Sequence, residues 1–265
     1  MEENILEYLG SNGTGFIHAG GRLATFKMMS LVRPQEGEII MEIGFGTGAT
    51  LIEMAASSKA DFFGFEYSET MFVSAKRRIR YCKMEGRIQI SLLKSKNQIP
   101  VADNTFDKIY AESIIAIQEG QDIRDLLIEL KRVLKPNGML IFNETIWLDN
   151  TDFDTAKSIN EHCKQSFGII QSNQEYLHLN DWKNLLKHIG FLDVQAFRMS
   201  EVPPLKQKIN RQNMRSLLFS LYGRIKSMTS FDNRRIRKGF RKEMDRIIDK
   251  DLKLMEGIFV KVSKG

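Results

Sequence analysis

The sequence predicts an α/β fold built on an open, mostly parallel seven-stranded sheet, with helices on both faces and a helical insertion before the last strand. Two observations predict the parallel sheet. Short apolar runs alternate with helical patterns through most of the chain, as they do in consecutive strand–helix–strand units. A glycine-rich stretch directly follows the first apolar run, which is typical of a sharp turn from a strand into a helix. A third observation, the loss of this alternation after residue 205 and a final apolar run at the end of the chain, predicts the insertion.

Seven apolar runs are the candidate strands. They cover residues 38–43, 61–66, 87–93, 106–112, 139–143, 191–197 and 257–262. Helical spacing of apolar residues lies between them, over residues 47–57, 68–84, 122–134 and 181–189, with Ser68 as the expected N-cap of the second helix. Because the crossovers that join parallel strands are right-handed and contain these helices, both faces of the sheet are expected to be covered.

Four parts of the chain follow from this pattern. We expect an N-terminal helical cap over residues 1–34, a cofactor-binding core over 35–202, a basic helical insertion or lid over 203–256, and a final core strand over 257–265. The chain has 39 basic and 33 acidic residues. Residues 203–257 contain 15 basic and 6 acidic residues, a net charge of +9, and the remainder of the chain has a net charge of −3. The insertion is therefore expected to contact an anionic membrane surface or an acidic carrier protein through residues 205–256, or to act as a lid. Nucleic acid is a disfavoured partner, because no base-recognition or aromatic-rich basic pattern accompanies the charge.

Composition excludes several classes of protein. With 42% hydrophobic and 27% charged residues, the 265-residue chain has ordinary globular composition. The two cysteines, Cys82 and Cys163, are too few for a disulfide framework, and no apolar run reaches the roughly 18 residues of a membrane span. The acidic N-terminus does not read as a secretory signal, so a cytoplasmic location is expected. The histidines show no i, i+4 pairing, and we predict no metal site.

The sharpest local feature is the glycine turn, residues 42–48. Gly44, Gly46 and Gly48 allow a tight turn and let a ligand lie against the backbone. Glu66 ends the second strand, and in an open α/β sheet a carboxylate there lies beside the same crevice and accepts hydrogen bonds from ribose hydroxyls. The turn therefore predicts a nucleoside-containing cofactor.

Three interpretations of this turn are open. Residues 44–49 also fit the dinucleotide fingerprint, so an NAD-dependent oxidoreductase is one alternative. Glu42 favours a different ligand, because a carboxylate two residues before the first glycine would repel a pyrophosphate and attract a sulfonium amino acid. A non-catalytic module that has kept the cofactor pocket is the third interpretation, motivated by Ser95 and Phe45.

The ordered motifs resemble those of the class I S-adenosylmethionine-dependent methyltransferases over roughly residues 15–200. The first motif of that family, an acidic residue followed by G-x-G-x-G, matches Glu42, Gly44, Gly46 and Gly48, and its acidic end of the second strand matches Glu66. Further stretches similar to family motifs cover residues 67–71, 99–107, 130–138 and 179–191. The resemblance is strongest to the small-molecule, ubiquinone/menaquinone-type subgroup. It implies a Rossmann-like fold, S-adenosylmethionine as cofactor, and methyl transfer by in-line displacement to a small-molecule acceptor that is lipophilic or carrier-bound.

The resemblance also implies roles for individual residues. Glu42 would bind the amino-acid end of the cofactor, Glu66 the ribose, and Tyr67 would start the following helix beside it. Ser95 stands where the family often has an aspartate that holds the adenine amino group. The candidate catalytic residues are Glu112, at the end of the fourth strand, and His18, within a stretch that resembles an H-P-G-G element. The candidate substrate-binding residues at the ends of the fourth and fifth strands are Tyr110, Glu144 and Trp147.

Overall fold

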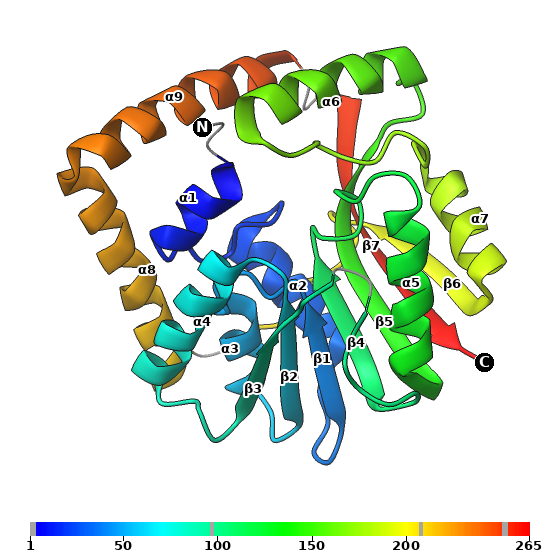
Figure 1. The fold of residues 1–265 in the computed structure, drawn as a ribbon. Coiled ribbons are helices and arrows are strands. Elements are labelled where there is room, and N and C mark those ends of the chain that lie inside the picture. The colour runs from blue at the N-terminus through cyan, green and yellow to red at the C-terminus, as the bar shows by residue number, and fades with distance from the viewer. Residues whose placement is uncertain (1–3, 96–97, 207–208, 251–253) are drawn as a thin grey trace.

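A seven-stranded sheet forms the centre of the molecule in the computed structural model, which describes residues 4–95, 98–206, 209–250 and 254–265 (Figure 1). Its strands are β1 (Ile39–Ile43), β2 (Asp61–Glu66), β3 (Ile88–Leu92), β4 (Phe106–Glu112), β5 (Leu134–Trp147), β6 (Phe191–Arg198) and β7 (Met255–Lys264). Their order across the sheet is β3-β2-β1-β4-β5-β7-β6. β1 to β5 pair in parallel, and β7 is antiparallel to both of its neighbours. The predicted fold class, a mostly parallel Rossmann-like sheet, is confirmed.

Helices cover both faces of this sheet. They are α1 (Ile5–Ser11), α2 (Gly21–Val32), α3 (Ala49–Ala55), α4 (Glu69–Cys82), α5 (Asp122–Val133), α6 (Phe153–Phe167), α7 (Leu179–Ile189), α8 (Arg211–Thr229) and α9 (Phe231–Lys250). Neighbouring strand residues face opposite apolar layers: Met41 packs with the side chains of α5 and α7, whereas Ile40 packs with those of α2, α3 and α4. Successive side chains of a strand point to opposite faces of the sheet, and both faces are covered by helices. The strands are therefore apolar almost throughout.

The structure extends the predicted elements in two places. β5 is longer than the predicted strand over residues 139–143, because it pairs with β7 from Met139 opposite Ser263 to Trp147 opposite Met255. α6 lies where the sequence showed no recognisable motif. Its N-cap Asp152 accepts a hydrogen bond from the Thr155 N–H, which satisfies one of the free donors of the first turn.

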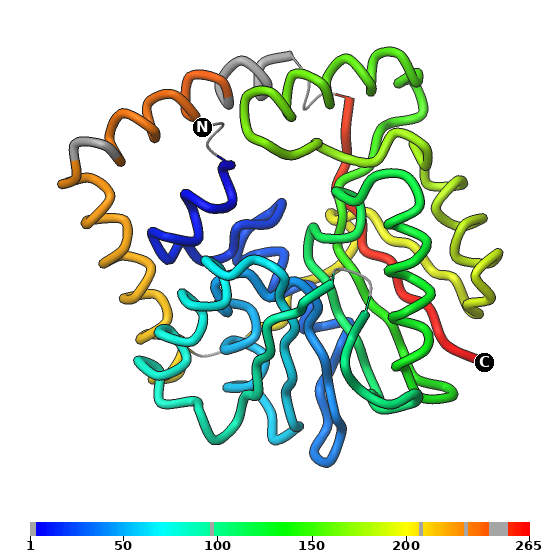
Figure 2. Tube along the Cα trace, viewed as in Figure 1, coloured from blue at the N-terminus to red at the C-terminus, as the bar shows by residue number. Residues whose placement is uncertain are grey.

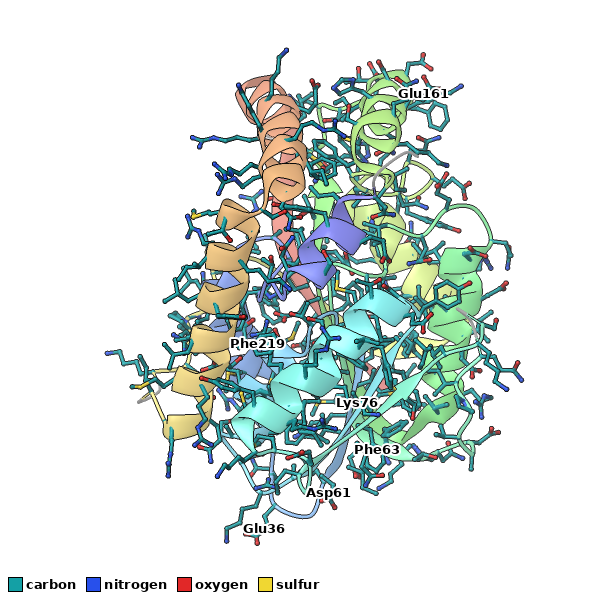
Figure 3. All side chains as sticks on the ribbon, turned by 60° about the vertical axis from the view of Figure 1, so that its left-hand side comes forward. Glu36, Asp61, Phe63, Lys76, Glu161 and Phe219 are labelled. Atoms are coloured by element: carbon teal, nitrogen blue, oxygen red, sulfur yellow. The ribbon has the colours of Figure 1, made fainter. Side chains whose placement is uncertain are left out.

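The predicted insertion before the last strand is confirmed as two helices. Figure 2 shows the chain leaving the sheet after β6, running through α8 and α9, and returning as β7. α8 packs against α3 and α4, and α9 packs against α6. Figure 3 shows Phe219 of α8 beside α4, where the guanidinium carbon of Arg78 lies 4.8 Å from the centre of its ring. The insertion therefore spans the end of the molecule that contains α1, next to the carboxyl ends of the strands (Figure 1).

Within the described ranges, every helix is too short or too polar to cross a bilayer.

Candidate functional site

The glycine turn after β1 adopts a backbone that favours glycine at three positions. The φ angles of Gly44, Gly46 and Gly48 are +69°, +54° and +77°. A Cβ atom on Gly44 would lie 2.6 Å from Cγ1 of Ile114, so a side chain there would collide with the Ile114 side chain. At Gly46 the nearest atom to such a Cβ would be the Met71 sulfur at 4.0 Å. The backbone is therefore open at the middle glycine, where a ligand can approach it closely.

A small cavity of about 60 Å³ lies beside this turn. One wall consists of the turn, the end of β1 and the start of α3. The opposite wall is the segment that joins α1 to α2. The lining residues are Phe16, Ile17, His18, Glu42, Gly44, Phe45, Gly46, Thr47, Ala49, Thr50 and Glu112. The structure thus brings together Glu42, Gly44 and Gly46 of the first motif and both predicted catalytic residues, whereas Gly48 does not line the cavity.

Glu66 binds the glycine turn directly. Its Oε2 accepts a hydrogen bond from the Gly46 N–H at 2.8 Å, and its Oε1 accepts from Tyr67 N–H at 2.7 Å and Ser68 N–H at 2.9 Å. Burial raises the pKa of this carboxyl, and the three N–H donors oppose that shift. The sequence predicted that Glu66 and the turn share one crevice, and in the structure they are in contact.

Glu42 is a second buried carboxylate, at the end of β1. The Tyr110 hydroxyl donates to its Oε2 at 2.8 Å, and the side chains face each other because Glu42 and Tyr110 are register partners of β1 and β4. Burial, and then repulsion from Glu112, raise the pKa of Glu42 well above its ordinary value. No lysine or arginine of the described chain pairs with Glu42. An uncompensated buried carboxylate of this kind favours a cationic ligand.

His18 and Glu112 form a pair in the opposite part of the cavity. Nε2 of His18 lies 3.1 Å from Glu112 Oε2 and 3.1 Å from the Thr25 hydroxyl. Thr50, on α3, donates to Glu112 Oε2 at 2.7 Å. Burial raises the pKa of Glu112, whereas His18 and the two threonine hydroxyls lower it. The arrangement places two groups that exchange protons beside the glycine turn.

The remaining predicted residues lie outside this cavity. Tyr110 is fully buried and supports Glu42. Glu144 accepts hydrogen bonds from the Ile114 and Ile115 N–H groups, so it holds the loop after β4. Trp147 packs in an apolar cluster with α6, and its Nε1–H donates to the Asn173 carbonyl. Ser95 and Tyr67 both have exposed side chains, on the loops after β3 and β2.

Sequence reasoning missed two threonines of the site. Thr50 orients Glu112, and the Thr47 hydroxyl donates to the Thr14 carbonyl at 2.6 Å, which fixes the segment before His18. Thr47 lies within the glycine turn and Thr50 follows it, but their roles depend on how distant segments fold over the turn. Within the described ranges, no group of three or more His, Cys, Asp or Glu side chains is arranged to hold a metal ion.

Comparison with known proteins identifies the family. Residues 40–138, which include the glycine turn, Glu66 and Glu112, match a family model described as a methyltransferase domain. The demethylmenaquinone methyltransferase of Bacillus pumilus is 30% identical over 161 residues, covering 58% of this chain and 67% of that protein. An O-methyltransferase of Pyrenophora dematioidea is 28% identical over 156 residues, covering 53% of this chain and 57% of that protein.

Solved structures show the same fold. Phosphoethanolamine N-methyltransferase 2 of Haemonchus contortus, in complex with S-adenosylmethionine, superposes with a TM-score of 0.67 at 19% identity, covering 98% of this chain. This chain spans 56% of the length of that protein. The fold, the order of the motifs and the similarity to the relative from Bacillus pumilus all indicate the same family: the chain belongs to the class I S-adenosylmethionine-dependent methyltransferases.

Proposed function

We propose that this chain transfers a methyl group from S-adenosylmethionine to a small-molecule acceptor. The observation that carries the proposal is a pair of buried carboxylates, Glu42 and Glu66, on either side of an open glycine turn. The ligand has a cationic sulfonium and a cationic amino group, which suit Glu42, and ribose hydroxyls, which suit Glu66. The open backbone at Gly46 fits the close approach that the cofactor requires.

The hydrogen bonds of Glu66 leave room for a ribose. A carboxylate offers about four lone-pair positions, and three N–H donors use three of them. One position remains for a hydroxyl. The cavity of about 60 Å³ is far smaller than the roughly 300 Å³ at which ligand pockets begin, so a bound cofactor would extend beyond it.

The mechanism needs orientation more than covalent chemistry from the protein. When bound, the cofactor would supply a methyl carbon made electrophilic by the sulfonium, to which a lone pair of the acceptor would bond in line as the carbon–sulfur bond breaks and S-adenosylhomocysteine leaves. The protein holds the two reactants and excludes water, which contributes about 7–11 kcal/mol to lowering the barrier. The His18–Glu112 pair takes up the proton that a hydroxyl or amine acceptor loses.

Relatives of this chain support a small, partly lipophilic acceptor. Their names include a demethylmenaquinone methyltransferase and a sterol 24-C-methyltransferase. Such acceptors partition into membranes, and the surface of α8 suits a membrane. Met214, Leu218, Tyr222 and Ile225 are each 48–70% exposed and recur at helical spacing on one face. We infer that this face, in the basic segment 205–256, contacts an anionic membrane surface.

Labelled methyl groups test the proposed activity. The protein is incubated with S-adenosylmethionine carrying a radiolabelled methyl group and a metabolite extract, and the extractable products are counted. We expect label in one or a few small molecules. Absence of transfer by a protein that binds S-adenosylhomocysteine would support a non-catalytic cofactor-binding module instead.

A further inference from the structure

A second and larger cavity lies between α1 and the inserted helices. Its volume is about 690 Å³, within the range of sites for small ligands. Its lining residues come from α1 and the segment that follows it, and from α8 and α9. Figure 1 shows how these helices are arranged around α1. The lining residues are Tyr8, Leu9, Asn12, Thr14, Gly15, Ser220, Leu221, Arg224, Ser227, Met228, Arg237 and Arg241.

Three arginines give this cavity a positive wall. Arg224 lies on α8, and Arg237 and Arg241 lie one turn apart on α9. Among the side chains that the structure describes, which leave out those of residues 231, 232 and 244–250 on α9, no carboxylate pairs with any of the three guanidinium groups, and no Asp or Glu lines the cavity. Arginine presents a planar fork of donors that matches the oxygens of phosphate or carboxylate. The wall therefore has the chemistry of an anion-binding surface.

The rest of the lining is largely apolar. Leu9 and the ring of Tyr8 come from α1, and Leu221 and Met228 come from α8. Leu221 is 51% exposed and Met228 is 39% exposed. Methionine and aromatic side chains adapt to irregular apolar ligands. A free inorganic anion would leave this surface in contact with water, whereas a ligand with an apolar body would cover it.

The two cavities share one wall. Thr14 and Gly15 line the larger cavity, and Phe16 and Ile17, the next two residues, line the smaller one beside the glycine turn. The Thr14 carbonyl accepts from the Thr47 hydroxyl of that turn at 2.6 Å. Residues 14–17 therefore border both cavities, and a molecule in the larger cavity lies against the segment that lines the smaller one.

We propose that the larger cavity holds the acceptor, and that the acceptor is an amphiphilic anion: an apolar molecule with a phosphate or carboxylate group. The anionic group lies against Arg224, Arg237 and Arg241, and the apolar body covers Leu9, Leu221 and Met228. The description of this ligand as the acceptor rests on the proposed methyl transfer, whereas the binding of an amphiphilic anion does not.

Calorimetric titration of the full chain tests the binding. The probes are octyl phosphate, octanoate, octanol, octyltrimethylammonium and inorganic phosphate. We expect octyl phosphate or octanoate, whichever head group the arginines prefer, to bind at least tenfold more tightly than octanol, inorganic phosphate and the cation. The variant Arg224→Gln/Arg237→Gln/Arg241→Gln should lose at least tenfold of this affinity.

A matched variant separates the cavity from general electrostatics. Lys226→Gln/Lys238→Gln/Arg235→Gln removes the same charge from the same two helices, but none of these residues lines the cavity. It should keep the affinity of the natural chain. Equal losses in the two variants, or equal binding of octanol, inorganic phosphate or the cation, would overturn the proposal.

The charge of the methylated product tests the identity of the acceptor. In the radiolabel experiment, the natural chain and the matched variant should label an anionic product that extracts into organic solvent, and the cavity variant should label at least tenfold less of it. A neutral or cationic product, or undiminished transfer by the cavity variant, would contradict this assignment. S-adenosylhomocysteine should bind equally to all three proteins. If it binds to none of them, the proposed methyl transfer fails, and the octyl phosphate titration still decides the cavity.

Discussion

Single buried carboxylates determine how the stability of the chain responds to pH, and Glu144, which holds the loop after β4, is the case with a defined pKa. Burial raises its pKa to about 7, although the N–H groups of the loop after β4 oppose this shift. The pKa of Glu144 in the folded chain exceeds its unfolded value of about 4.3. Its contribution to the free energy of unfolding is therefore complete below a pH of about 4.3 and is lost as the pH rises through 7.

The variant Glu144→Gln keeps an oxygen that accepts from the Ile114 and Ile115 N–H groups but does not ionise. We expect its free energy of unfolding to lie within about 1 kcal/mol of that of the natural chain at pH 4.5 and to exceed it by up to about 4 kcal/mol at pH 8. Urea unfolding at both values measures this. Glu161→Gln, at an exposed position of α6, is the control and should follow the natural chain. Parallel pH curves for all three proteins would contradict the buried ionisation.

Glu112 supplies a second prediction. Its carboxylate accepts from Thr50 and faces His18, so it is placed to receive a proton, directly or through His18. Glu112→Gln should lower methyl transfer to a hydroxyl or amine acceptor by about 10²–10⁴-fold, with the affinity for S-adenosylhomocysteine changed by less than threefold. Transfer by the natural chain should also fall as the pH drops through the raised pKa of Glu112, since a protonated carboxyl cannot accept a proton. A variant with undiminished transfer would remove Glu112 from the mechanism.

The inserted helices depend on Arg78 of α4 for their position. This fully buried side chain donates from Nη1 to the Ser216 carbonyl and the Ser220 hydroxyl of α8, and from Nη2 to the Gly13 carbonyl and the Thr47 hydroxyl. Burial lowers its pKa to about 10. One guanidinium thus ties α8, the segment after α1 and the glycine turn to α4.

Arg78→Met should therefore loosen α8 and the cofactor site together. It leaves several buried acceptors without a donor, each at a cost of about 1–3 kcal/mol, so we expect the free energy of unfolding to fall by at least about 2 kcal/mol. Trypsin should cut α8 faster than in the natural chain. Arg77→Met, at the exposed neighbouring position, controls for the loss of charge. Equal trypsin cleavage and stability in the two variants would show that α8 is held by other contacts.

The exposed apolar face of α8 predicts membrane binding. Sedimentation with phosphatidylglycerol vesicles should carry the protein down, whereas phosphatidylcholine vesicles should not, and added salt should weaken the binding. Leu218→Ser/Ile225→Ser should reduce it by about tenfold, because each side chain loses apolar area that the bilayer would cover. Ile128→Ser/Leu192→Ser changes two similarly exposed residues, on α5 and β6, and should bind like the natural chain. Equal sedimentation of the two double variants would rule out α8 as the contact.

The sequence was sufficient for the parallel sheet and the glycine turn, because both depend on local patterns. Apolar runs with glycine at the turn predicted β1, and the acidic end of β2 predicted that Glu66 meets the turn, as it does at Gly46 N–H. The support of Glu42 by Tyr110 was not predictable, since it requires the register of two strands that are distant in sequence. The roles of Arg78 and the cavity under α9 were hidden for the same reason. They arise from contacts between helices that are distant in sequence, and the apolar spacing within one helix does not specify its partner.

The molecule as a whole is organised around one charged ligand at the carboxyl ends of β1 and β2. Calorimetric titration with S-adenosylhomocysteine measures this most directly, using the natural chain, Glu42→Gln, Glu66→Gln and the exposed control Glu69→Gln. The natural chain and the control should bind S-adenosylhomocysteine and not NAD, and each of the other two variants should lose at least tenfold in affinity, or about 1.4 kcal/mol. A natural chain that binds NAD in place of S-adenosylhomocysteine, or variants at Glu42 and Glu66 that bind as well as the control, would contradict the account.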